Sequence, residues 1–266
     1  MTSTEQALNE LADRLWQAEV DHVPVEPISQ DRPDLTVEDA YVIQDRNVTR
    51  RVTAGSVVRG RKVGLSTSRA QKLTGIDEPD CGVLLDDMFL DDSEEVPFDA
   101  LLQPRVVSVM ALVMASDLAG PGVTTADVLT AVGGVMPAIE VVDSRIADWR
   151  TLAVDTVADN ASTGRVVLGG RISRVIDLDL RLEGMLLHRN GAPIESGAGA
   201  AALGSPARSV AWLANRLGRL GAGLRRGDVV LPGALHRMVP VRAADCFQAH
   251  FAHLGTVTAQ FTEAAV

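Results

Sequence analysis

The sequence predicts an α+β protein, in which a small helical N-terminal region at residues 1–75 precedes a β-rich body at residues 76–266. Helical spacing of apolar residues dominates the start of the chain. From Gly82 onward, short β-rich runs are separated by Gly, Pro and Asp, as in strands joined by turns. The 266 residues are enough for one large domain or one domain with a smaller appendage. We treat the β-rich body as a single structural unit.

Apolar spacing and a capping pattern predict the N-terminal helices. The first helix, residues 4–19, has its apolar residues at Leu8, Leu11, Leu15 and Trp16. The second begins at residues 35–39, where Thr36 can cap the helix and Asp39 follows three residues later. Gly55, Gly60 and Gly64 then punctuate a short strand, and residues 68–73 predict a brief helix.

The body is predicted to be mostly strands with two helices, at residues 125–132 and 206–220. Asn190-Gly191 lies between alternating residues and is the strongest hairpin signal in the chain. The last strands are expected at residues 228–231, 238–241, 245–251 and 255–261. The polar stretch at residues 155–164 is expected to be a loop.

Composition excludes several classes of function. A net charge of −10 repels phosphate backbones and anionic lipid, so we expect neither nucleic acid nor a membrane as partner. The N-terminus is polar and unlike a signal peptide. The two cysteines form no CxxC motif, which suits a reducing cytoplasm. Walker, Rossmann and GxSxG motifs do not occur.

Three local groups could carry chemistry. Lys62 lies between Gly60 and Gly64, where a lysine can reach deep into a cleft and exchange protons, although a surface lysine is the ordinary interpretation. Glu140 lies inside an apolar strand, so its carboxylate must be paired, protonated or metal-bound. The loop at residues 155–164 offers hydroxyl, amide and backbone N–H donors, among them Asn160 and Ser162.

These groups occur within blocks that resemble one family. The blocks, in order, are LTVEDAYVIQ, GRKVGLS, GIDEPDCGVL, QPRV, VMPAIEVVDSRIADW, VADNASTG, ALGSPARSVAWLA and GDVVLPGAL. Together they resemble the 2-keto-4-pentenoate hydratase and 4-oxalocrotonate decarboxylase family, within the fumarylacetoacetate hydrolase-like fold. The resemblance covers nearly the whole chain and implies a mixed, rolled β-body in a homo-oligomer.

The resemblance also assigns roles. Lys62 and Asp80 would be the proton-transfer pair, and Ser162 with its loop would lie near the substrate. The family holds a divalent metal with three glutamates, and two of these positions correspond to Val107 and Val109 here, whereas the third is Glu140. Residues i and i+2 of a strand face the same way, so one carboxylate and two isopropyl groups would remain, too few oxygens for Mg²⁺ or Mn²⁺.

We therefore expect no metal and no other cofactor. Lys62, Asp80 and Glu140 are the expected catalytic residues, with Glu140 as a neutral acid because it now faces valines and desolvation would raise its pKa. The expected substrate-binding residues are Arg105, Val107, Val109, Asn160 and Ser162.

Two classes of function remain open. The first is a metal-independent lyase that acts on an enolisable or conjugated small-molecule carbonyl compound by hydration, decarboxylation, isomerisation or cyclisation. The second is a catalytically silent relative that binds a ligand or a partner subunit. A conventional metal-dependent hydratase with its ligands mutated is the remaining alternative.

Overall fold

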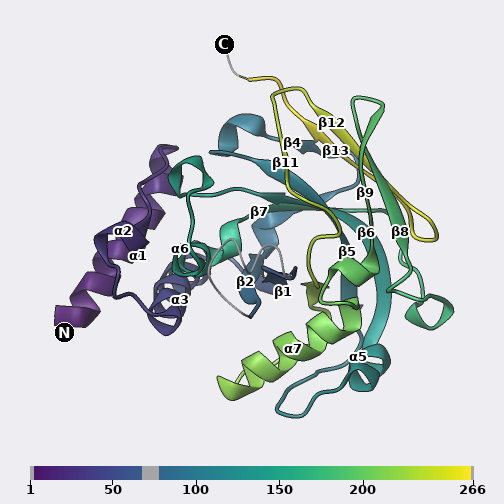
Figure 1. Ribbon diagram of the computed structural model, residues 1–266, viewed down its shortest axis with the longest axis horizontal. Coiled ribbons are helices and arrows are strands. Elements are labelled where there is room, and N and C mark those ends of the chain that lie inside the picture. Colours follow the sequence, from purple (N-terminus) through teal and green to yellow (C-terminus); the bar gives the residue numbers. More distant parts are fainter. Residues whose placement is uncertain (1–2, 68–77, 265–266) are drawn as a thin grey trace.

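The structure is a computed structural model and describes residues 3–67 and 78–264. A layer of helices lies beside a strongly curved β-sheet, and a second sheet packs against its other side (Figure 1). The α+β prediction is confirmed. The brief helix expected at residues 68–73 lies outside the described residues.

The helical layer forms where the sequence predicts it. It consists of α1 (Ser3–Asp21), α2 (Ile28–Asp31) and α3 (Val37–Thr53), joined by α6 (Ala153–Ala158) from much later in the chain. Thr36 caps α3, and its hydroxyl and the Asp39 carboxylate form the expected reciprocal capping box. The apolar faces of α1, α3 and α6 share one buried cluster, which fixes this layer against the body. Helix α6 corrects the prediction of a continuous polar loop at residues 155–164.

The large sheet runs β2-β1-β10-β5-β6-β7-β3, and β11 pairs with the start of β5. Its strands are β1 (Val58–Gly64), β2 (Asp80–Leu85), β3 (Phe89–Asp91), β5 (Arg105–Met114), β6 (Val132–Val142), β7 (Thr163–Leu168), β10 (Val229–Leu231) and β11 (Val239–Pro240). Strand β1 belongs to residues 1–75 by sequence and to the β-body by hydrogen bonding. The domain boundary at residue 75 stays a prediction.

The second sheet runs β4-β13-β12-β8-β9. Its strands are β4 (Glu95–Val96), β8 (Gly184–Arg189), β9 (Ala192–Ala198), β12 (Cys246–Phe251) and β13 (Gly255–Phe261). The predicted hairpin is confirmed, because Asn190 and Gly191 join β8 to β9 with φ values of 51° and 82°. Left-handed φ at both positions is the geometry that favours Asn-Gly in a two-residue turn.

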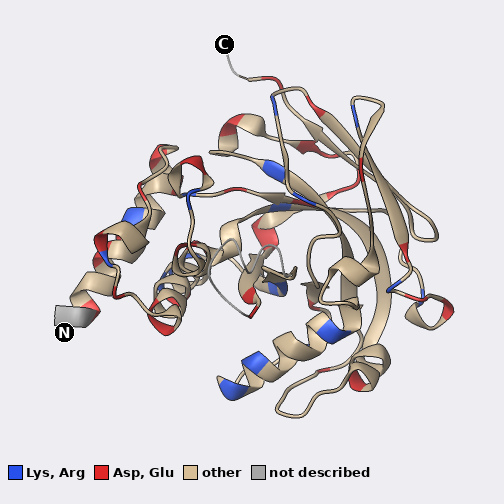
Figure 2. Cartoon of the chain, viewed as in Figure 1, with Lys and Arg blue, Asp and Glu red and all other residues tan. Residues whose placement is uncertain are grey.

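The main core lies between the two sheets and extends under α5 (Thr125–Ala131) and α7 (Pro206–Arg219). Short 3-10 turns connect the elements: η1 (Asp86–Met88), η2 (Phe98–Ala100), η3 (Ala147–Trp149), η4 (Asn160–Ser162), η5 (Val175–Asp177) and η6 (Gly199–Ala201). Basic residues recur along α7, and acidic residues are spread over most other elements (Figure 2). None of the helices in the described ranges is both long and apolar enough to cross a bilayer.

Candidate active site

The curvature of the large sheet brings Lys62 and Glu140 together. Lys62 is on β1 and Glu140 is on β6, with β10 and β5 between them in the sheet. Their side chains form an ion pair between Lys62 Nζ and Glu140 Oε1, with only 3% and 5% of each side chain exposed. Because the two strands are not neighbours, this pair must cross the concave face of the rolled sheet. That face is where the site lies.

Asp80 faces the same space from the first position of β2. Asp80 pairs with Gly64 and Lys62 pairs with Gly82, so both side chains lie on one face of this antiparallel pair. A Cβ atom at position 64 would strike the Asp80 carboxylate. Gly64 therefore leaves the space that the Asp80 carboxylate occupies.

Burial makes Asp80 a group that can exchange a proton near neutral pH. It is fully buried, and its carboxylate oxygens lack a well-oriented hydrogen-bond donor among the described residues. Desolvation raises the pKa of Asp80 to about 6, although the Lys62 ammonium and the nearby N–H groups of Asp80 and Gly64 oppose the rise. A carboxyl group with this pKa can serve as either acid or base at pH 6–7.

Sequence analysis predicts a neutral acid at Glu140, and that role stays a prediction. Glu140 forms an ion pair with the Lys62 ammonium group across the concave face. The carboxyl group whose pKa the structure raises is that of Asp80, because desolvation outweighs the attraction of Lys62. Among the residues that the structure describes, Asp80 forms no ion pair.

Val107 and Val109 line the concave face beside Glu140. Val107 pairs with Glu140 and Val109 with Ala138, and both valines are almost completely buried. They belong to an aliphatic cluster with Leu84, Ala111, Ala138, Val166 and Leu231. This side of the site therefore presents methyl groups.

The residues on this face do not fit a divalent cation. Val107 and Val109 carry no donor atoms, and Glu140 already bonds an ammonium group. In the part of the chain that the structure describes, no group of three or more His, Cys, Asp or Glu could hold a metal ion. Mg²⁺ and Mn²⁺ prefer several oxygen ligands, and of positions 107, 109 and 140 only Glu140 offers a carboxylate.

Arg105 lies at the start of the strand that carries the valines. By strand alternation it faces the same side as Val107. Its guanidinium lies 4.4 Å from the centre of the Trp149 ring, and partial burial lowers the pKa of Arg105. Stacking on the Trp149 indole holds the Arg105 guanidinium at the end of β5, beyond Val107 and Val109.

The polar turn after α6 contributes a backbone carbonyl to the site. The Ala161 carbonyl oxygen accepts a hydrogen bond from Lys62 Nζ at 2.6 Å. The Asn160 amide instead bonds both backbone groups of Val83, at 2.7 and 2.9 Å. Ser162 Oγ donates to Asp159 at 2.9 Å. Thus the two predicted side chains fasten the turn, and sequence reasoning missed Ala161, since a backbone carbonyl has no residue signature.

Helix α3 holds the strand that carries Asp80. The Gln44 amide donates to the carbonyls of Cys81 and Val157, at 3.0 and 2.8 Å. The Tyr41 hydroxyl accepts from the Cys81 N–H at 3.2 Å. These contacts fix the peptide next to Asp80 and tie the helical layer to the site.

Comparisons with known proteins agree with this architecture. The sequence model described as fumarylacetoacetate (FAA) hydrolase C-terminal matches residues 96–262. The chain belongs to the fumarylacetoacetate hydrolase family. Within that family it is 46% identical to a 2-keto-4-pentenoate hydratase of Paraburkholderia xenovorans, over 97% of this chain and 96% of the relative. It is 39% identical to a 2-oxo-hept-4-ene-1,7-dioate hydratase of Escherichia coli, over 94% and 96%.

A solved structure within the fumarylacetoacetate hydrolase family shows the same fold over the whole length. The 4-oxalocrotonate decarboxylase of Pseudomonas putida G7, in complex with magnesium and adipate, superimposes with a TM-score of 0.93 and 34% identity. The alignment covers 98% of this chain and 99% of that one. The family resemblance drawn from the sequence blocks is therefore confirmed, and an enzyme of the lyase type is supported.

Proposed function

We propose that this chain is a lyase that acts on an enolisable or conjugated carbonyl compound through Lys62 and Asp80, with no divalent metal at the valine positions. The observation that carries the proposal is the meeting of three ionisable groups beside an aliphatic wall. Lys62 and Glu140 form a buried ion pair, and Asp80 has a pKa of about 6. Val107 pairs with Glu140 in the sheet, which supports the proposal that the two valines occupy the ligand positions implied by the family resemblance.

Each charged group has a distinct task in this mechanism. The Lys62 ammonium offsets negative charge that develops on the substrate oxygen when the carbonyl enolises. Asp80 takes or returns the proton at carbon, for which its pKa is suited. Glu140 and the Ala161 carbonyl hold the ammonium in place. Arg105 at the rim remains a proposed substrate-binding residue, as do Asn160 and Ser162 in the turn after α6.

The aliphatic wall formed by Val107 and Val109 affects which substrates the site can accept. The relatives are named for 2-keto acids whose C=C bond is one CH₂ group away from the carbonyl, so they are enolisable, and their enols are conjugated dienoates. Methyl groups at Val107 and Val109 desolvate charge, so we propose a larger and more apolar substrate than a small dianion. Hydration and isomerisation each need a proton transfer at carbon, and decarboxylation ends with one, when the enolate left by loss of CO₂ is protonated. A cytoplasmic location and a homo-oligomer are part of this proposal.

Turnover and metal content test it together. We expect the protein to turn over 2-hydroxydienoates with extended apolar tails. The loss of the ultraviolet absorbance of the diene measures the rate. Lys62→Ala and Asp80→Ala should each lower turnover by about 10²–10⁴-fold. Asp245→Asn, a change at a buried carboxylate in the other sheet, is the matched control and should retain activity.

Metal dependence is measured on the same samples. EDTA should leave turnover unchanged, and elemental analysis after dialysis against Mg²⁺ should find much less than one metal per chain. One metal per chain that is lost in Glu140→Ala would contradict the proposal. Full activity of both Lys62→Ala and Asp80→Ala would show that the acid–base roles are wrong.

A further inference from the structure

The turn that reaches Lys62 has an unusual backbone. Asn160, Ala161 and Ser162 have φ values of 53°, 51° and 51°, so three consecutive non-glycine residues are left-handed. Each such residue costs about 1–2 kcal/mol relative to the right-handed region. A conformation of this kind persists only where the surroundings determine it, and it is concentrated at functional sites.

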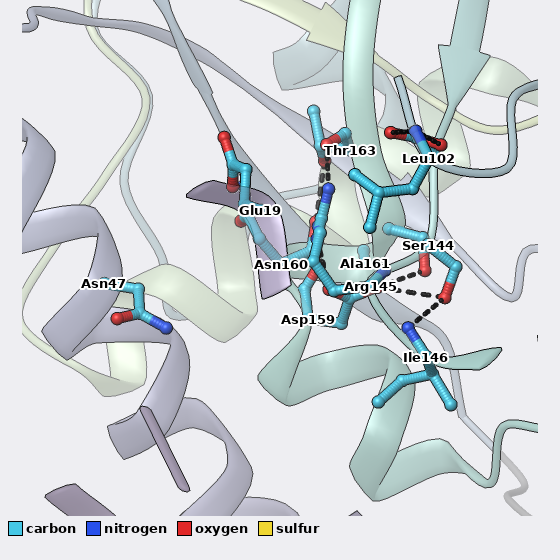
Figure 3. Close-up of polar contacts among 12 residues, drawn as sticks. Glu19, Asn47, Leu102, Ser144, Arg145, Ile146, Asp159, Asn160, Ala161 and Thr163 are labelled. Atoms are coloured by element: carbon cyan, nitrogen blue, oxygen red, sulfur yellow. Dashed lines mark hydrogen bonds and ion pairs between the residues drawn. The ribbon is translucent and has the colours of Figure 1, made fainter. Parts of the chain in front are cut away.

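Arg145 grips this turn at both ends. Its Nη2 donates to the Asp159 carbonyl and its Nη1 donates to the Thr163 carbonyl, at 3.0 Å in the second case. These two residues flank the left-handed segment directly. Figure 3 shows Arg145 close to Asp159, Asn160 and Ala161.

Asp159 completes the grip from within the turn. Its carboxylate forms an ion pair with Arg145 Nε, and it accepts hydrogen bonds from Ser162 Oγ at 2.9 Å and Ser144 Oγ at 3.3 Å. The side chains of Arg145 and Asp159 are 8% and 0% exposed. The carboxylate is thus saturated by donors that belong to the turn and to the strand end before it.

The grip has a cost that packing alone does not explain. A buried ion pair loses its hydration, and apolar replacement of such a pair is often neutral or stabilising. Here most hydrogen bonds of Arg145 and Asp159 go to the left-handed turn at residues 160–162 and to the residues that flank it. The product of that geometry is a carbonyl at Ala161 that points at Lys62. The turn also packs tightly against β2, since a Cβ atom at Gly82 would lie 2.6 Å from the backbone oxygen of Asn160.

We propose that Arg145 and Asp159 are positioning residues, which hold the left-handed turn so that the Ala161 carbonyl keeps the Lys62 ammonium beside Asp80. The inference rests on the proposed function only for the statement that Lys62 and Asp80 do the chemistry. Loss of either positioning residue should release the turn, displace the carbonyl and let the ammonium move.

The chain offers a direct spectroscopic test, because it contains only two lysines, Lys62 and Lys72. Protein labelled with [¹³Cε]lysine should show two side-chain Cε signals, and Lys72→Arg assigns them. The Lys62 signal senses Asp80, whose charge changes near pH 6. The test variants are Asp159→Asn and Arg145→Lys, of which the second keeps the charge but loses the planar fork.

The control is the other pair of the same kind, Arg189 and Asp245. Asp245 forms an ion pair with the Arg189 guanidinium at 2.6 Å and accepts hydrogen bonds from the Arg242 N–H and from Asn190, but it lies just before β12 of the second sheet. Asp245→Asn therefore removes comparable contacts without touching the turn. It should leave the Lys62 signal and its pH dependence as in the wild type.

In both test variants the Lys62 signal should move. The midpoint near pH 6 should rise by about 0.5 or more, because a displaced ammonium no longer lowers the pKa of Asp80 as strongly. We also expect kcat to fall by about 10²-fold with little change in KM, as for a misplaced catalytic group. If Asp159→Asn does not fold, Arg145→Lys decides.

Two results would overturn the inference. One is a folded Arg145→Lys variant with the wild-type signal and midpoint. The other is an equal change in Asp245→Asn, which would mean general loosening of the fold. The lysine signal needs no turnover, so failure of the proposed function would be seen separately, as full activity in Lys62→Ala despite a normal response of the signal.

Discussion

Replacement of Asp80 by asparagine should stabilise the protein above pH 6, even though it removes the proposed acid–base group. Asp80 is fully buried, and its pKa is raised to about 6 because desolvation penalises the carboxylate. The amide has nearly the same shape and no charge to desolvate. Asp80→Asn therefore relieves a cost that the native protein bears for its site.

The magnitude follows from the difference between the folded and unfolded pKa. The ordinary value is 3.8, so the rise is about two pH units and corresponds to about 3 kcal/mol. The folded state binds the proton more tightly than the unfolded state. The favourable contribution is thus fully present below pH 3.8 and is lost as the pH rises through 6. Relative to Asp80→Asn, the wild type should lose most of this contribution, about 2.4 kcal/mol, between pH 4 and pH 7.5.

Urea unfolding of both proteins at several pH values measures this difference. Each curve gives the free energy of unfolding and the m-value, and the two proteins share all their other titrating groups. Subtraction of one from the other isolates Asp80. A difference that stays flat between pH 4 and pH 8 would refute the reasoning, because Asp80 would then have the same pKa in both states.

Two further variants probe the wall and the helical layer. The double change Val107→Glu and Val109→Glu should lower the melting temperature in EDTA, since it adds two carboxylates beside Glu140. Addition of Mg²⁺ should raise the melting temperature again, and only in this variant. If the melting temperature does not respond to metal, the valines do not occupy ligand positions. Tyr41→Phe leaves the buried N–H of Cys81 without its acceptor and should cost about 1–3 kcal/mol of unfolding free energy in urea, whereas an unchanged midpoint would contradict that hydrogen bond.

Local patterns in the sequence were sufficient for several elements. Thr36 and Asp39 stand at the spacing of a capping box, and the structure has that box. Asn190-Gly191 can adopt left-handed φ at both positions at low cost, and the hairpin turns there. These signals work because cap and turn energies depend on residues a few positions apart.

The same kind of signal failed for residues 155–164. Their polar residues read as a loop, yet residues 153–158 form a helix that packs against α1 and α3. Val157 and Ala158 bury their side chains in that layer. Burial against distant helices outweighed the polar composition of the segment, and no local pattern records such a contact.

The candidate site divides in the same way. The sequence by itself determined which residue types are present: a lysine between glycines, a glutamate within an apolar strand, and two valines at positions where the family resemblance implies carboxylates. Only the tertiary structure decided that Lys62 pairs with Glu140 across the rolled sheet, and that Asp80 is left to bear the raised pKa. Charge and side-chain chemistry are properties of a residue, whereas desolvation and pairing depend on the neighbours that the curvature of the sheet provides.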